Sequence, residues 1–80
     1  AITVNAVVPG YVDTASARLY AETSVPGGWA AAEQRWSAQT PMGRVATAEE
    51  LARVVGLLVS PDAGWITGQL LVADGGLTLR

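Results

Sequence analysis

The chain has 80 residues, half of them apolar and 15% charged, and its formal net charge is −2. This composition excludes a disordered tail and allows one small globular unit with a modest core. The five basic residues are scattered arginines, so we expect no nucleic-acid partner. No apolar run reaches the about 18 residues of a membrane span, so we expect no membrane partner. Cysteine, histidine and lysine are absent, which excludes thiolate metal sites, imidazole bases and lysine Schiff bases.

The first predicted strand, Ile2 to Val8, is a near-continuous apolar run rich in β-branched residues, and Pro9-Gly10 closes it. Because the run is apolar on both faces, it predicts a central strand of a parallel sheet with helices on both sides. The second predicted strand runs from Gln69 to Ala73. It can pair with one edge of the first strand, which leaves the other edge of the first strand without a partner. We therefore expect the missing neighbours upstream, so that residues 1–80 are the C-terminal part of a longer domain.

Three helical stretches are predicted between these strands. The first opens at Asp13 or Thr14, both good N-caps, and the second covers about residues 29–39. The third starts with a capping box, in which Thr47 is the N-cap and Glu50 stands at the N3 position. Strand, helices and strand in this order make half of an α/β domain. The third helix has one apolar face that we expect to pack on a sheet: Leu51, Val54, Val55 and Leu58.

Four short motifs lie along the chain. Residues 4–14 read VNAVVPGYVDT, residues 40–44 read TPMGR, residues 47–50 read TAEE and residues 66–76 read ITGQLLVADGG. In this order they resemble the short-chain dehydrogenase/reductase family: its VNxxxPGxxxT strand-to-lid segment, its P-x-G-R element, the helix start that follows, and its ITG…DGG ending. Ala48 stands where that family commonly has proline. The ordered set covers essentially the whole chain, which makes the resemblance specific.

The resemblance implies an α/β fold, namely the C-terminal part of a Rossmann-like doubly wound parallel sheet, with residues 11–41 as a substrate lid. It also implies NAD or NADP as cofactor, with the nicotinamide end beneath the loop after the first strand. By position in that loop, Pro9 and Gly10 shape the turn under the nicotinamide ring. The Val12 backbone then hydrogen-bonds the carboxamide, and Thr14 contacts the carboxamide or the adjacent phosphate. Backbone amides at a helix N-terminus also suit a pyrophosphate.

The cofactor-turn and catalytic motifs of that family are absent from these 80 residues. There is no G-x-G turn, and neither Tyr11 nor Tyr20 is followed four residues later by a lysine. Without such a neighbour, a tyrosine near its ordinary pKa of about 10 is a poor acid or base at neutral pH. We therefore assign no catalytic residue and no metal ligand, and we expect the N-terminal remainder of the same enzyme to supply the catalytic groups.

Several polar side chains have two interpretations. Asn5 fits a buried amide that satisfies loop backbone better than a functional group. Thr14 serves as an N-cap, a cofactor contact or both, and Asp13 fits a cap or helix-dipole partner better than a catalytic acid. Arg44 fits a pairing with carbonyls or with a carboxylate. Asp74, followed by two glycines, fits a turn with positive φ angles.

The predicted lid also carries large side chains with two possible uses. They either line a pocket for an apolar or acyl substrate, or they pack the lid onto the domain or a neighbouring subunit. The stretch Pro26-Gly27-Gly28 is either a lid hinge or a plain loop. The large side chains are Leu19, Tyr20, Trp29 and Trp36.

From the resemblance we expect the C-terminal portion of a cytoplasmic NAD(P)-dependent oxidoreductase that acts on a small-molecule substrate and forms a homo-oligomer, either a tetramer or a dimer. We expect this enzyme to reduce a carbonyl or an acyl thioester, and the long lid and the tail of residues 75–80 favour an acyl thioester reductase over a sugar or steroid enzyme. The alternative is a non-catalytic binding or assembly module. Such a module would dock on a partner's sheet edge through the open backbone ladder of the first strand.

Overall fold

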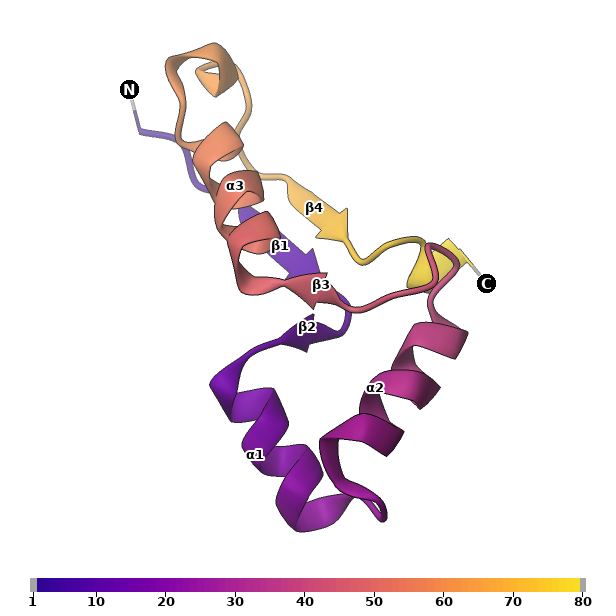
Figure 1. The fold of residues 1–80 in the computed structure, drawn as a ribbon. Helices are drawn as coiled ribbons and strands as arrows, with labels where there is room; N and C mark the ends of the chain where they lie inside the picture. The colour runs from indigo at the N-terminus through magenta and orange to yellow at the C-terminus, as the bar shows by residue number, and fades with distance from the viewer. Residues whose placement is uncertain (1, 80) are drawn as a thin grey trace.

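The computed structural model describes residues 2–79, and these residues form an α/β arrangement (Figure 1). Two longer strands lie side by side, a helix crosses one of their faces, and a pair of helices projects from one end. In chain order the elements are β1 (Ala6–Pro9), β2 (Val12–Asp13), α1 (Ala15–Ser24), α2 (Gly28–Gln39), β3 (Ala46–Thr47), α3 (Ala48–Leu58), the 3-10 helix η1 (Pro61–Ala63), β4 (Leu70–Ala73) and the 3-10 helix η2 (Leu77–Leu79).

The parallel pairing of β1 with β4 confirms the predicted sheet, but β1 is shorter than expected. The register joins Ala6 to Leu70 and Pro9 to Ala73. The predicted strand from Ile2 begins only at Ala6, because the chain before it bonds to a loop rather than to a strand. There the Val4 N–H donates to Thr67 Oγ1 at 3.1 Å, and the Val4 carbonyl accepts from the Gly68 N–H at 2.8 Å.

Asn5 binds the loop before β4 with both ends of its amide. Its Nδ2 donates to the Ile66 carbonyl at 3.2 Å, and its Oδ1 accepts from the Gln69 N–H at 3.0 Å. The expectation that this amide satisfies loop backbone is confirmed, although the side chain is half-buried rather than buried. Asn5 therefore sets where the two strands begin to pair.

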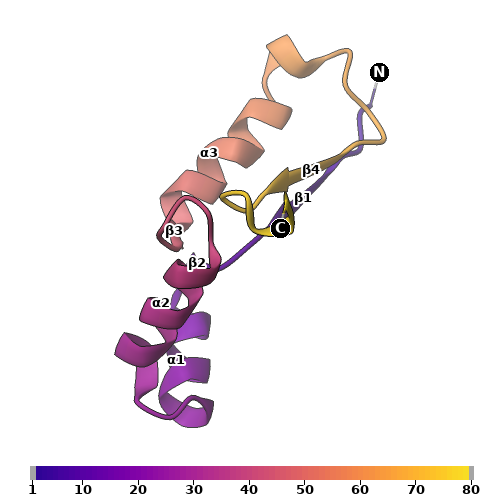
Figure 2. The ribbon, with the colours of Figure 1, turned by 90° about the vertical axis from the view of Figure 1, so that its right-hand side faces the viewer.

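The helix α3 covers one face of the sheet, and Figure 2 shows no described helix on the opposite face. The predicted capping box is present, and three of the four predicted packing residues (Leu51, Val54 and Leu58) are half-buried. Val55 remains 49% exposed. The strands therefore have one covered and one open face within the described residues.

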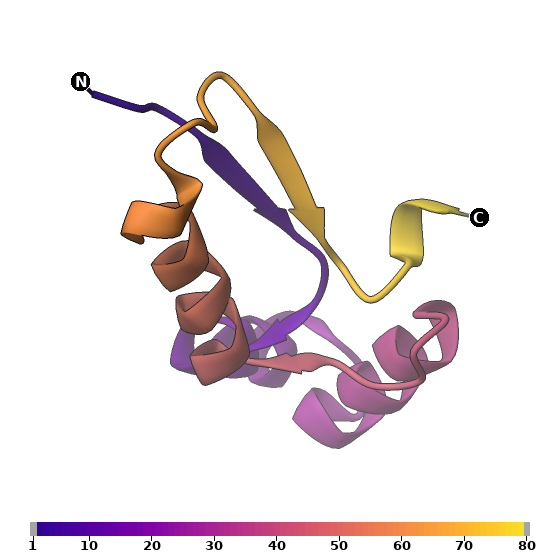
Figure 3. The same ribbon diagram turned by 90° about the horizontal axis from the view of Figure 1, so that it is seen from above.

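The helices α1 and α2 form a hairpin that stands away from the sheet (Figures 1 and 3). Ala21 and Ala32 are fully buried, because small side chains let the two helices approach closely. Gly27 and Gly28, with φ of 89° and 68°, make the turn between the helices. The Glu22 carboxylate accepts the Trp29 N–H at 2.8 Å and so caps α2, whose own N-cap is a glycine without a side chain.

The molecule is elongated and has little core of its own. Its radius of gyration is 14.8 Å, whereas a compact domain of 80 residues has about 11.6 Å. The apolar residues buried within residues 2–79 are three alanines and one valine, and Leu70 on β4 stays 73% exposed. None of the helices in this part of the chain is long and apolar enough to cross a bilayer.

Candidate functional site

The loop that follows β1 lies at the carboxyl ends of both long strands. Pro9 closes β1 opposite Ala73, and Gly10 then passes beside Asp74, the residue after β4. A Cβ atom on Gly10 would lie 2.9 Å from Asp74 Cβ and 3.1 Å from Asp74 Cα, closer than side chains pack. Only glycine allows this approach. In open α/β sheets, ligands bind outside the carboxyl ends of the strands.

Asp74 builds the turn after β4, as predicted. Its carboxylate accepts the Gly76 N–H and the Thr78 N–H, both at 3.0 Å. The hydrogen bond with Thr78 holds the pKa of this carboxyl below its usual range. Gly75 and Gly76 have φ of 64° and 92°, which favour glycine. An ionised side chain that accepts two backbone bonds is a structural acceptor, so Asp74 is not placed to act as an acid.

The same turn receives the end of α2. A Cβ on Gly75 would lie 2.8 Å from Thr40 Cγ2, and the Gly75 carbonyl accepts the Met42 N–H at 3.1 Å. Thr40 is buried, and its hydroxyl donates to the Trp36 carbonyl at 2.8 Å. The helical hairpin is therefore anchored to the end of the sheet at a specific point.

A short parallel pair, which the sequence did not predict, holds the loop after β1 from one side. In this pair Val12 and Asp13 of β2 lie opposite Ala46 and Thr47 of β3. The Ala46 N–H donates to the Tyr11 carbonyl at 3.0 Å. Because successive backbone groups of a strand point to opposite sides, the Val12 N–H points away from β3. The Val12 N–H is therefore not used in the β2–β3 pairing.

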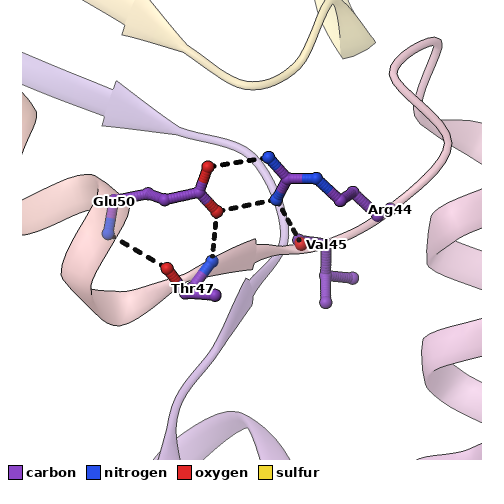
Figure 4. Close-up of polar contacts among 4 residues, drawn as sticks. All are labelled: Arg44, Val45, Thr47 and Glu50. Atoms are coloured by element: carbon purple, nitrogen blue, oxygen red, sulfur yellow. Dashed lines mark hydrogen bonds and ion pairs between the residues drawn. The ribbon is translucent and has the colours of Figure 1, made fainter.

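The pair is in turn tied to the start of α3 by a charged network (Figure 4). Arg44 donates two hydrogen bonds of 2.7 Å to the Glu50 carboxylate and one of 3.3 Å to the Val45 carbonyl. Glu50 also accepts the Thr47 N–H at 2.9 Å, and its own N–H donates to Thr47 Oγ1 at 3.1 Å. The Arg44 guanidinium lowers the pKa of Glu50 from 4.5 to about 2. Arg44 thus binds both a carboxylate and a carbonyl, the two partner types expected for it.

Thr14 is the N-cap of α1, and its Oγ1 accepts the Ala17 N–H at 3.0 Å. The interpretation of Asp13 as the cap is wrong, because Asp13 pairs with Arg18 instead, at 2.7 and 2.8 Å. This pairing holds the pKa of Asp13 below its usual range. The first turn of α1 contains no acidic residue, so its backbone amides remain suited to an anion.

Two of the four large lid side chains pack within the chain. Tyr11 stacks on Trp36 with ring centroids 4.9 Å apart, and Trp36 meets Trp29 edge-on at 5.9 Å. Leu19 and Tyr20, on the outside of α1, are 66% and 57% exposed. The sequence singled out Trp29 and Trp36 at helical spacing, but it contained no signal for the partner, Tyr11.

A cavity of about 240 Å³ lies on the α3 side of the loop. None of the four predicted cofactor residues (Pro9, Gly10, Val12 and Thr14) lines it. Its walls include Tyr11, Ala46, Leu51, Val54, Ala73 and Asp74.

Comparison with known proteins supports the resemblance. The sequence model of a family described as enoyl-(acyl carrier protein) reductase matches residues 1–78. A crystal structure of a short-chain dehydrogenase family protein from Francisella tularensis superposes with a TM-score of 0.90 at 31% identity, over 98% of this chain and 34% of that one. The chain belongs to the short-chain dehydrogenase/reductase family. Its neighbours in this family have a Rossmann fold, which agrees with the parallel β1–β4 pair.

Curated relatives in the short-chain dehydrogenase/reductase family are similar over almost the whole chain. The dehydrogenase OXI1 of Cochliobolus heterostrophus is 47% identical over 95% of this chain and 32% of its own length. The 3-oxoacyl-[acyl-carrier-protein] reductase FabG of Pseudomonas aeruginosa is 42% identical over 96% of this chain and 28% of its own. The NADPH-dependent reductase YwfH superposes with a TM-score of 0.83 at 38% identity, over 95% of this chain and 30% of that structure. The chain therefore spans about a third of the length of these relatives.

Proposed function

We propose that this chain forms the nicotinamide-side wall of an NAD(P) site in an oxidoreductase, with Pro9, Gly10, Val12 and Thr14 as the cofactor-contacting residues. Its main support is the position of this loop at the carboxyl ends of β1 and β4, where Gly10 passes against Asp74. The relatives named above include an NADPH-dependent reductase, YwfH. When bound, the nicotinamide cofactor supplies or accepts a hydride.

The residues of the loop fit such a cofactor. Gly10 has no side chain and Pro9 has no N–H, so the turn offers a smooth surface to a flat ring. The Val12 N–H points away from β3, and we propose that it donates to the carboxamide oxygen. Thr14 Oγ1 accepts the Ala17 N–H, which leaves the hydroxyl proton to donate to a phosphate or carboxamide oxygen.

We assign the proton transfer to groups in the N-terminal remainder of the enzyme. The Tyr11 hydroxyl donates to Gln39 Oε1 at 2.9 Å, which commits its proton to a structural bond. Tyr20 has no lysine four residues later, and the chain has none at all. This chain's part in the reaction is then to bind and orient the cofactor and to cover the substrate.

Residues 11–41 are proposed as the substrate lid, and an acyl thioester is the proposed substrate class. The exposed Leu19 and Tyr20 give α1 an apolar surface that suits an acyl chain. A 3-oxoacyl reductase among the relatives and the description of the matching family support the same class. Trp29 and Trp36 contribute less to this surface, because their rings pack against each other.

The unpaired edge of β1 and the open face of the β1–β4 pair are the proposed contacts with further parts of the same enzyme. Within the described residues β1 pairs on one edge only, and Val8, Leu71 and Val72 on the two strands are 40–48% exposed. The exposed Leu79 suits a contact between subunits of a homo-oligomer in the cytoplasm. The open β1 edge equally favours the alternative, a binding module that docks on a partner's sheet.

The proposal is tested on the complete protein, with whatever sequence accompanies these 80 residues in the cell. NADPH and NADH are titrated by fluorescence, and initial rates are then measured with acetoacetyl and crotonyl thioesters, a simple ketone and an aldose. We expect saturable binding of one nicotinamide cofactor and the fastest turnover with a thioester. Fast turnover of the ketone or aldose with inert thioesters would contradict the substrate class, and no cofactor binding would contradict the oxidoreductase itself.

A further inference from the structure

Tyr11 lies between Gly10 and Val12 in the loop after β1 and is held at three points. Its ring stacks on Trp36 with centroids 4.9 Å apart and planes inclined by 2°. Its hydroxyl donates to Gln39 Oε1 at 2.9 Å, and its carbonyl accepts the Ala46 N–H at 3.0 Å. The first two contacts reach α2 and the third reaches β3. The residue on the N-terminal side of Val12 is therefore held from both α2 and β3.

The residue on the other side of Val12 is tied to the same helical hairpin. Asp13 accepts two hydrogen bonds from Arg18 of α1, at 2.7 and 2.8 Å. The Arg18 guanidinium lies over the Trp29 ring, 4.8 Å from its centroid. Trp29 meets Trp36 edge-on at 5.9 Å, and Trp36 stacks on Tyr11. These contacts form a closed circuit that starts and ends on the two neighbours of Val12.

We propose, on the basis of the function proposed above, that this circuit makes Tyr11 a positioning residue for the cofactor. Tyr11 and Asp13 hold the peptide groups on either side of Val12, so the direction of the Val12 N–H depends on the α1–α2 hairpin. Tyr11 transmits the position of the lid to the amide that orients the nicotinamide ring. The side chain of Tyr11 itself does not contact the cofactor.

Stacking, rather than the phenol, carries most of the effect. A planar ring held face to face over an indole resists rotation of its own side chain, and the backbone that bears it is bonded to β3. Removal of the ring frees the loop, whereas removal of the hydroxyl leaves the stack. Tyr11→Phe and Trp36→Phe therefore keep the circuit closed, and Tyr11→Leu and Trp36→Leu open it.

The test compares these four variants of the complete protein with the wild type. The dissociation constant for NADPH is measured by fluorescence, and amide hydrogen exchange in residues 11–14 is measured without cofactor. We expect the leucine variants to bind NADPH about three- to tenfold more weakly and to exchange faster in this loop. The phenylalanine variants should return both values close to those of the wild type. The double leucine variant should be no worse than either single one, because one break already opens the circuit.

Two further variants keep the test sharp. Arg53→Gln makes the same change as Arg18→Gln at an exposed arginine of α3 that is outside the circuit, and it should change neither the affinity nor the exchange. Arg18→Gln breaks the circuit at an exposed side chain, so it should act like Tyr11→Leu. It remains informative if the leucine variants of Tyr11 and Trp36 fold poorly. Wild-type exchange and affinity in Arg18→Gln and Tyr11→Leu would overturn the positioning role. A wild type that binds no cofactor would refute the proposed function, while the exchange data still decide whether the circuit holds the loop.

Discussion

At the scale of single residues, two positions of the loop after β1 determine its path. Gly10 sets how closely the two strand ends approach, because any side chain there would collide with Asp74. Thr14 sets where α1 begins, because its hydroxyl replaces a missing backbone partner in the first turn. Both residues were predicted as cofactor contacts, and the structure shows that each also has a local structural task. The two roles can be separated by substitution.

Replacement of Gly10 by alanine should destabilise the complete protein by about 1–3 kcal/mol, because the new Cβ must push Asp74 aside. The free energy of unfolding in urea measures this change. Gly56→Ala is the matched control, since Gly56 lies inside α3 with no atom within 4 Å of a new Cβ. That control should be neutral or more stable by up to about 1 kcal/mol. Equal losses in both variants would contradict a specific contact at Gly10.

Replacement of Thr14 should separate its N-cap from its cofactor contact. Thr14→Ala should cost about 1 kcal/mol of stability through the lost cap. Thr14→Asp keeps a capping oxygen but has no proton to donate at neutral pH, so it should restore stability without restoring NADPH affinity. Thr14→Ser should restore both, as measured by urea unfolding and cofactor titration. If Thr14→Asp binds NADPH as the wild type does, Thr14 is a cap alone.

At the scale of elements, the start of α3 and the loop after β1 stabilise each other. The capping box orders Thr47, which pairs with Asp13 through β3 and β2. Arg44 holds the Glu50 carboxylate of this box with two hydrogen bonds and also binds the carbonyl of Val45. A helix cap thus also supports one strand of the candidate site.

The contribution of Glu50 should depend on pH in a defined range. Because its pKa falls from 4.5 to about 2 on folding, its stabilising effect is complete above pH 4.5 and is lost as the pH falls toward 2. Glu50→Gln retains a capping side chain but lacks the charge. The difference in unfolding free energy between this variant and the wild type should be constant above about pH 5 and shrink below pH 4.5.

Glu49→Gln is the control for this titration. Glu49 is 87% exposed and lies 4.0 Å from Arg53, so little stability depends on it. Its substitution should leave the unfolding free energy unchanged over the same pH range. A Glu50→Gln difference that stays constant down to pH 3 would contradict the charge pairing with Arg44.

At the scale of the whole molecule, the 80 residues form a scaffold with open surfaces. The radius of gyration of 14.8 Å and the absence of a large buried side chain in residues 2–79 show how little apolar surface the chain buries by itself. One face of the β1–β4 pair is open, and α1 and α2 contact the sheet only near its carboxyl end (Figure 2). Stability then depends on surfaces that cover these faces.

The 80 residues expressed alone should therefore lack a cooperative thermal transition. We expect weak near-ultraviolet circular dichroism from the tryptophans and early-eluting species on gel filtration, with the complete protein as the control. A sharp transition and a single monomer peak would instead favour the alternative, a self-sufficient binding module.

Much of the fold follows from local patterns. The Thr14 and Thr47 caps, the Asp74 turn and the helix of residues 28–39 each depend on residues within four positions of one another. The β2–β3 pair does not, because two residues per strand give no periodicity to detect. The sequence also did not predict that β1 starts only at Ala6, since this start depends on hydrogen bonds to residues 66–69.

For the candidate site, the sequence by itself determined which residues lie in the loop after β1 and the chemistry that they offer. Tertiary structure alone decided how that loop is held. Tyr11 meets Trp36 and Asp13 meets Arg18, and Arg18 then reaches Trp29. No local rule relates Tyr11 to a partner 25 residues away, because that contact exists only after α1 and α2 have folded back on each other. The sequence determines local conformation through caps and turns, whereas contacts between distant residues are set by the packing of whole elements.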